Sequence, residues 1–178
     1  GFQKERLIMT YTLEEFARDC KAALQKDPGP AGREEVRTYV SRACLDEDFR
    51  DKHLSDNDAP PRTILYEDPD LKFCICAHFY EGAKESSPHG HGGSWAIYGQ
   101  AVGQTVMTDW QCVEPAADGK PGLVEKVRDY PLNPGDAHVY NEEDLHSPSR
   151  ADTTRLIRIE GENLDHVTRV PYKKVRAA

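Results

Sequence analysis

The sequence changes character at Arg62, and this change limits what the chain can fold into. From Arg62 onward, short runs rich in β-branched and aromatic residues are separated by glycine, proline and aspartate roughly every ten residues. Short strands at such regular spacing are typical of an antiparallel sandwich or barrel. The predicted strands cover residues 63–66, 72–80, 95–102, 105–113, 123–130, 138–140 and 154–160.

The residues before Arg62 have the pattern of helices instead. Thr12 and Glu15 form a capping box, and the apolar residues behind it recur with the spacing of an amphipathic helix that ends at the Asp-Pro-Gly-Pro stretch 27–30. A second helix is predicted from about 33 to 44. The acidic stretch 46–61 ends in two prolines and is predicted to be a connector.

The length of 178 residues is that of one domain. We therefore expect a single domain over 1–178, mainly β, in which a helical segment over about 1–60 packs against a β-barrel over about 62–172.

The overall charge and the cysteines exclude several classes of protein. The formal net charge of −8, from 23 Lys and Arg against 31 Asp and Glu, argues against a nucleic-acid partner. No apolar run approaches the ~18 residues of a membrane span, and no basic region followed by an apolar stretch marks a signal peptide, so we expect a cytoplasmic protein. The 5 cysteines have no C-x-x-C spacing, which argues against a disulfide scaffold or a cysteine zinc site.

His89-Gly90-His91 is the first candidate for chemistry. Side chains alternate along an extended chain, so imidazoles at i and i+2 lie on the same side. Imidazole nitrogen binds Zn, Fe, Cu and Ni, and two such rings need a third ligand from elsewhere. The alternative is a pair of polar strand residues hydrogen-bonded to the backbone.

The residues around this pair resemble the first motif of the cupin superfamily. In that motif a glycine precedes H-x-H, and a glutamate and a second glycine follow it. Gly82, one position early, and Gly103 match the two glycines, whereas Ala96 stands at the position of the glutamate.

The second cupin motif resembles the segment from Gly135 to His146. Asn141 and Glu143 stand where that motif has a proline and a second glycine, but the spacing is kept. The resemblance implies a double-stranded β-helix (jelly-roll) barrel that holds one divalent metal with three histidines. The implied metal ligands are His89, His91 and His146.

Within the cupins the chain is most similar to cysteine dioxygenase and related thiol dioxygenases. These enzymes also open with helices, hold iron with three histidines and lack the glutamate ligand. Arg62, which precedes His89 by 89 − 62 = 27 residues, matches the family's substrate-carboxylate arginine, and Tyr80 matches an aromatic residue of its pocket. The resemblance implies Fe(II), with Zn, Ni and Mn as alternatives, and a small anionic substrate that reacts with dioxygen.

Two positions depart from this resemblance. Ala96 stands where animal cysteine dioxygenases carry a crosslinked cysteine, which bacterial thiol dioxygenases also lack. The family's histidine and tyrosine on the late strand align with Arg158 and Glu160, so its hydroxyl donor to bound dioxygen is missing. A thiol is therefore only one candidate substrate, and the broader expectation is a metalloenzyme acting on a small anion.

Two other functions stay open at this point. One is a non-oxidative cupin enzyme, a lyase, isomerase or decarboxylase that uses Zn, Mn or Ni as a Lewis acid. The other is a cupin that binds a small ligand without turnover. The resemblance is also compatible with a homodimer.

The two candidate arginines each have two interpretations. Arg62 could anchor a substrate carboxylate, because a guanidinium offers two parallel donors, or it could be an ion-paired arginine at the entrance of the barrel. Arg158 and Glu160 lie on one face of their strand, and that face either lines the barrel or faces water.

Tyr98 and two further histidines complete the set. Tyr98 flanks Ala96 at two-residue spacing and is expected to project into the pocket. His78 is expected to be a core residue, and His138 is expected beside the site or on the surface. The candidate catalytic residues are Arg62, Tyr80, Tyr98 and Arg158.

Overall fold

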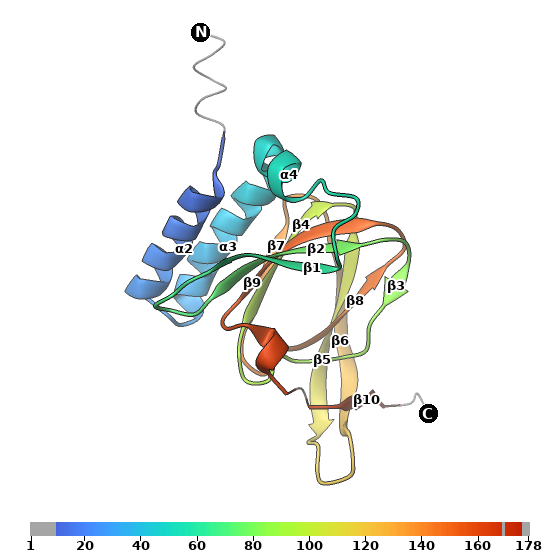
Figure 1. Ribbon diagram of the computed structural model, residues 1–178. Coiled ribbons are helices and arrows are strands. Elements are labelled where there is room, and N and C mark those ends of the chain that lie inside the picture. The colour runs from blue at the N-terminus through green and yellow to red at the C-terminus, as the bar shows by residue number, and fades with distance from the viewer. Residues whose placement is uncertain (1–9, 169, 176–178) are drawn as a thin grey trace.

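The strands form two five-stranded sheets in the computed structural model, which describes residues 10–168 and 170–175 (Figure 1). In spatial order, the first sheet contains β1 (Arg62–Glu67), β2 (Cys74–Tyr80), β9 (Thr154–Glu160), β4 (Ala96–Val102) and β7 (Ala137–Tyr140). The second sheet contains β10 (Tyr172–Lys174), β6 (Gly122–Leu132), β5 (Thr105–Glu114), β8 (Leu145–Arg150) and β3 (Lys84–Glu85).

The order of these strands is that of a jelly roll. From β2 to β9 the chain crosses to the other sheet at every step except at the β5–β6 hairpin, and all neighbours in this part are antiparallel. Two sheets connected in this way form the double-stranded β-helix. The predicted fold class, a mainly β jelly-roll barrel with N-terminal helices packed against it, is confirmed.

Three helices lie on the outer side of the first sheet (Figure 1). They are α2 (Leu13–Lys26), α3 (Pro30–Leu45) and α4 (Glu47–His53). As predicted, Thr12 caps α2, because its hydroxyl accepts a hydrogen bond from Glu15 N–H at 3.1 Å. α3 packs directly on β4, β7 and β9, and α2 and α4 pack against α3.

The helices and the sheets enclose two separate cores. The larger core lies between the helices and the first sheet and includes Phe16, Val40 and Ile157. The smaller core lies between the two sheets and consists of Ala96, Tyr98, Met107, Leu132 and Tyr140. Because the helices cover only the outer face, the space between the sheets is left for the polar side chains described below.

Gly99 on β4 lets α3 approach the sheet. A Cβ atom at Gly99 would lie 2.3 Å from Val40 Cγ1 and 2.8 Å from Cys44 Sγ, both of which are on α3. Distances this short are not tolerated by packed side chains. The close packing of α3 on the first sheet therefore requires glycine at this position.

Several elements differ from the sequence-based expectation, among them the short strands β3 and β10, which were not predicted. The predicted connector 46–61 begins with α4, because Asp46 accepts a hydrogen bond from Phe49 N–H at 2.9 Å and the Phe49 side chain is buried. β8 was not expected, because its serines and Pro148 hide the strand pattern, yet it pairs with β5 and β3. The prediction of a single domain over 1–178 stays a prediction, and its residues 1–9 and 176–178 lie outside the described part.

All five cysteines are free thiols, as the sequence suggests. None of the helices in the described residues combines the length and apolar character that a membrane crossing needs.

We predict that Gly99→Ala destabilises the protein by about 1–3 kcal/mol, because the new methyl group forces α3 away from β4. The free energy of unfolding from chemical denaturation checks this. Val102→Ala, at the exposed end of the same strand, is the control and is expected to change stability by less than about 0.5 kcal/mol. Equal stability of Gly99→Ala and the parent protein would contradict the close packing of α3.

Candidate metal centre

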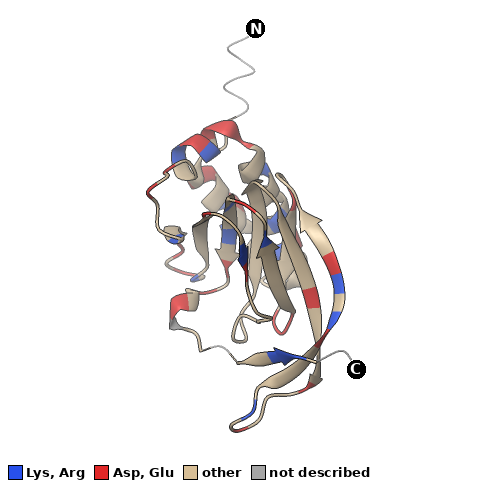
Figure 2. Ribbon diagram, turned by 90° about the vertical axis from the view of Figure 1, so that its right-hand side faces the viewer, with Lys and Arg blue, Asp and Glu red and all other residues tan. Residues whose placement is uncertain are grey.

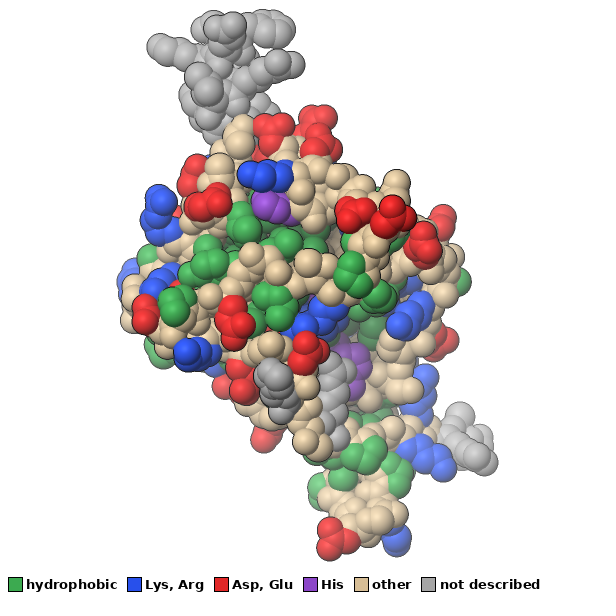
Figure 3. All heavy atoms as spheres, viewed as in Figure 1, with side chains coloured by type: hydrophobic (Ala, Val, Ile, Leu, Met, Phe, Trp, Pro, Cys, Tyr) green, Lys and Arg blue, Asp and Glu red, His purple; other side chains and the backbone are tan. Residues whose placement is uncertain are grey.

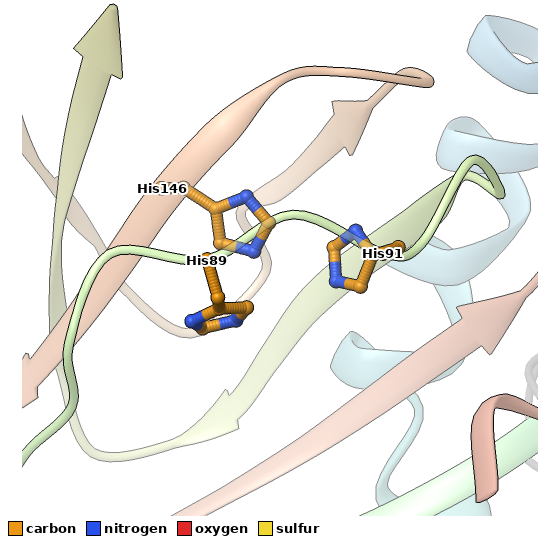
Figure 4. Close-up of side chains that lie close together, drawn as sticks. All are labelled: His89, His91 and His146. Carbon is orange, nitrogen blue, oxygen red and sulfur yellow. The ribbon is translucent and has the colours of Figure 1, made fainter. Parts of the chain in front are cut away.

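Three histidines from two chain segments form a cluster between the sheets (Figure 4). His89 and His91 come from the segment between β3 and β4, and His146 comes from β8. One potential ligand nitrogen from each ring lies within 4.8 Å of the other two. The structure thus brings together all three histidines that the cupin resemblance implies.

Backbone pairing places the first of these ligands. His89 N–H donates to the carbonyl oxygen of His146 at 2.9 Å, and His146 N–H donates to the carbonyl oxygen of His89 at 3.0 Å. Ser86 N–H also donates to the carbonyl of Pro148 at 3.0 Å. The segment that carries His89 is therefore attached to β8 by its main chain.

The cluster is buried on one side and open on the other. His146 and His91 have exposed fractions of 0% and 2%, whereas His89 is only partly buried. Burial lowers the pKa of His146 well below its usual range, and positive charge on its neighbours lowers it further. His146 is thus a neutral imidazole at neutral pH, which is the form that binds a metal ion.

Hydrogen bonds orient the rings. The Tyr98 hydroxyl oxygen lies 3.0 Å from Nε2 of His91 and 3.1 Å from Nε2 of His146. Nδ1 of His89 lies 2.9 Å from the carbonyl oxygen of Ser87, so Nδ1 carries the hydrogen and Nε2 the lone pair. A backbone carbonyl that fixes the tautomer of a histidine in this way is common around metal ligands. Three imidazoles at this separation could hold one divalent cation.

Arg158 and Glu160 both point into the barrel, which answers the question that the sequence left open. The Arg158 guanidinium lies over the Tyr98 ring, 4.3 Å from its centroid, and the exposed fraction of Glu160 is 1%. Arg158 is paired with Tyr98 across β9 and β4, so the strand register produces this stacking. One nitrogen of Arg158 lies 4.0 Å from Glu160.

Arg62 is held by an ion pair inside the protein. Its Nε and Nη2 contact the two Glu160 oxygens at 3.2 and 2.6 Å, and its Nη1 contacts Asp165 at 2.7 Å. Burial acts to lower the pKa of Arg62, but the bond to Glu160 outweighs it and the pKa is raised. The geometry favours the ion-paired interpretation of Arg62 over the carboxylate anchor.

A cavity of about 510 Å³ lies beside the open side of the cluster. Its lining includes His89 and the predicted residues Arg62, Tyr80 and Arg158. None of the described residues that line it is Asp or Glu. In Figure 3, Lys or Arg side chains and a His side chain meet in a hollow of the face turned to the viewer.

Arg150, at the end of β8, also lines this cavity and was missed in the sequence. Its exposed fraction is 4%, and its guanidinium lies 4.1 Å from the centroid of the Tyr80 ring. The available signal was its spacing: Arg150 follows His146 by four residues on one strand, so both side chains share a face.

The remaining predicted residues also have clear positions. His78 is buried, as expected, with Nδ1 2.7 Å from the Tyr80 hydroxyl, and it lines the cavity. His138 does not join the metal cluster; it packs between the rings of Tyr130 and Tyr140, with centroids 5.0 and 4.6 Å away.

No protein-family model matches this sequence, and no curated protein matches it. Solved cupin structures resemble it in fold. A cupin-2 domain containing protein from Shewanella frigidimarina is 16% identical, with a TM-score of 0.44 over 62% of this chain and 89% of its own. A protein with a double-stranded β-helix domain from Klebsiella pneumoniae is 11% identical, with a TM-score of 0.46 over 70% of this chain and 88% of its own. KdgF from Halomonas is 17% identical, with a TM-score of 0.44 over 66% of this chain and 95% of its own. These likenesses concern the fold alone.

We predict that the metal-stripped protein takes up one equivalent of a divalent cation such as Zn²⁺, and that His146→Ala weakens binding by at least about 100-fold. Calorimetric titration and metal analysis after gel filtration check this. His138→Ala is the matched control, because that histidine lies outside the cluster, and it is expected to keep full binding. Full binding by His146→Ala would contradict the assignment.

We predict that Glu160→Gln destabilises the protein by about 3 kcal/mol, because it leaves the partly buried Arg62 without its main partner. Asp165→Asn removes the other partner of the same arginine. Since Asp165 is 61% exposed, its loss is expected to cost less than about 1 kcal/mol. If thermal or chemical unfolding showed the same loss of stability in both variants, the buried ion pair between Arg62 and Glu160 would not be the dominant one.

Proposed function

We propose that this chain is a metal-dependent cupin enzyme that acts on a small anionic substrate. One divalent cation is held by His89, His91 and His146. The observation that carries the proposal is that this cluster opens, through His89, onto a cavity lined by arginines and by no described carboxylate. Such a site provides both a place for a cation and a place for an anion next to it.

The finer proposal is an Fe(II)-dependent dioxygenase that resembles cysteine dioxygenase and uses a small thiol- or carboxylate-bearing substrate with dioxygen. It is supported by the all-histidine ligand set, in which no carboxylate reduces the charge of the cation. When bound, a divalent cation supplies Lewis-acid chemistry, and iron adds one-electron chemistry with dioxygen.

Tyr98 is the side chain best placed to take part in the reaction. Its hydroxyl lies at hydrogen-bond distance from both His91 and His146, so it can hold or move a proton at the cluster. The alignment with thiol dioxygenases assigns a hydroxyl donor to the position of Glu160, whereas in this protein Tyr98, from another strand, brings a hydroxyl to the histidines. The Arg158 guanidinium over the Tyr98 ring adds positive charge beside this group.

The same position of Tyr98 favours a second candidate. A hydroxyl next to a Lewis-acid site is also the arrangement that a lyase, isomerase or decarboxylase needs for acid–base catalysis without oxidation, with Zn, Mn or Ni in place of iron. Binding of a small ligand without turnover is the third outcome of the experiment below. A homodimer and a cytoplasmic location stay predictions from the sequence.

We predict oxygen consumption when the protein is reconstituted anaerobically with Fe(II) and then given air-saturated small thiols and carboxylates. Parallel samples that contain Zn²⁺, Mn²⁺ or Ni²⁺ instead of Fe(II) are analysed for products that form without consumption of oxygen. No uptake with any substrate would overturn the dioxygenase, and products in the Zn, Mn or Ni samples would then identify the non-oxidative enzyme.

In either reaction, Tyr98→Phe is expected to lower kcat by about 10²-fold or more when compared with the parent protein at saturating metal, because the hydroxyl beside the cluster is removed. Tyr140→Phe is the control: its hydroxyl bonds to Tyr130 at 2.7 Å, and only its ring faces His146. Equal rates in Tyr98→Phe and the parent protein would remove Tyr98 from the mechanism.

A further inference from the structure

The strongest unexplained feature outside the histidine cluster is a buried arginine without an anionic partner. Arg150 has an exposed fraction of 4%, and its Nε is buried without a hydrogen-bond partner. The structure shows no ion pair between Arg150 and any described residue. A buried charge without a counterion is unfavourable unless an anion is bound beside it.

A second cation lies in the same cavity. Arg158 is largely buried, with 12% of its side chain exposed, and the one carboxylate that it pairs with among the described residues, Glu160, is 4.0 Å away and already bonded to Arg62. Both guanidinium groups line the same cavity. Burial lowers the pKa of Arg150, Tyr80 acts to raise it, and the positive charge of Arg158 acts to lower it.

Both arginines are held by aromatic rings. Arg150 lies over Tyr80 at 4.1 Å and Arg158 lies over Tyr98 at 4.3 Å. When the face of a guanidinium stacks on a ring, the N–H groups along its edge stay available to hydrogen-bond acceptors that lie in the guanidinium plane. The two oxygens of a carboxylate can accept two such bonds at once. The rings thus fix the two cations without neutralising them.

The charge of the cavity is opposite to that of the whole protein. The helices and outer loops carry many acidic residues, whereas several strands in the middle of the molecule carry basic ones (Figure 2). Lys84 lines the same cavity. Among the lining cations of the described residues, Arg62 has close carboxylate partners in Glu160 and Asp165, and Arg158 has only the longer 4.0 Å contact with Glu160. Two guanidinium groups without a close counterion in one cavity favour a ligand with two negative charges.

We infer that Arg150 and Arg158 together bind a small dianion, with two carboxylates or one doubly charged oxyanion group, beside the histidine cluster. This inference rests on the proposed function and narrows its substrate class: Arg62 is a structural arginine, and Arg150 with Arg158 forms the anion site. Tyr98 connects the two parts, because its ring contacts Arg158 and its hydroxyl contacts His91 and His146. A dianion of a few carbon atoms fits the volume of about 510 Å³.

The test measures binding, so it does not depend on turnover. Calorimetric titrations at pH 7.5 compare succinate with butyrate, and inorganic phosphate with acetate, on metal-free and Zn²⁺-loaded protein. Succinate is expected to bind at least about tenfold more tightly than butyrate, which has the same chain length and one charge fewer. The succinate and phosphate titrations separate a dicarboxylate from a single doubly charged group.

The variants separate binding from a structural role. Arg150→Met and Arg158→Met are each expected to weaken dianion binding by at least about tenfold. Arg150→Met is also expected to raise the Tm of the ligand-free protein, because it removes a buried charge without a counterion. Arg155→Met on β9 is the matched control: Arg155 is buried too, but it donates to the Asp56 carbonyl and to Asn57 at 3.1 and 2.8 Å. It is expected to lower the Tm and leave binding unchanged.

Two results would overturn the inference. One is that succinate binds no more tightly than butyrate and phosphate no more tightly than acetate. The other is a fall in the Tm of Arg150→Met with unchanged dianion binding. Zn²⁺ binding without any anion binding would overturn the dianion site and leave the metal centre in place. Dianion binding without metal binding would support the anion site and overturn the proposed enzyme.

Discussion

The arrangement of the site depends on the reciprocal backbone hydrogen bonds between His89 and His146. Between β3 and β4 the chain forms no strand in the described structure beyond this one bridge, so these two bonds, together with the bond from Ser86 N–H to the Pro148 carbonyl, fix where the segment lies on β8. His91 follows two residues later and reaches the same space, where the Tyr98 hydroxyl meets both His91 and His146. Ligand positions set by main-chain pairing are more rigid than positions set by side chains alone, which suits a cation that tolerates little variation in distance.

The cations around the cluster divide into two kinds according to what compensates them. Arg62 is bonded to Glu160 and Asp165, and it closes the edge of the first sheet over a buried carboxylate. Arg150 and Arg158 are instead covered by aromatic rings, which accept a guanidinium but carry no net charge. The same residue type therefore stabilises the fold in one place and leaves a positive field in another.

The helices contribute by covering the outer face of the first sheet. With α3 packed against β4 through Gly99, the apolar surface of that sheet is buried on the outside. The inner face can then carry histidine, arginine and glutamate, whose burial costs free energy, because the larger core supplies most of the hydrophobic stabilisation.

Local patterns in the sequence predicted much of this protein. The strand pattern after Arg62 and the capping box at Thr12 predicted most of the strands and the first helix, and the resemblance to the cupin motifs predicted that His89, His91 and His146 lie together. These signals are local or follow a fixed motif, so they are visible without contacts. α4 and β8 were missed because α4 depends on the cap at Asp46 and on burial of Phe49, and β8 depends on pairing with two other strands.

The roles of the arginines were decided only by the tertiary structure. Arg62 and Glu160 are 98 residues apart, and no local pattern relates them. Whether an arginine is compensated depends on which carboxylates lie within a few ångströms of it in space, and the strong distance dependence of ion pairs makes this a property of the folded state. The sequence by itself indicated which histidines form the cluster. The fold decided that Arg62 is the closely ion-paired arginine, whereas Arg150 has no ion pair among the described residues and Arg158 has only a 4.0 Å contact with Glu160.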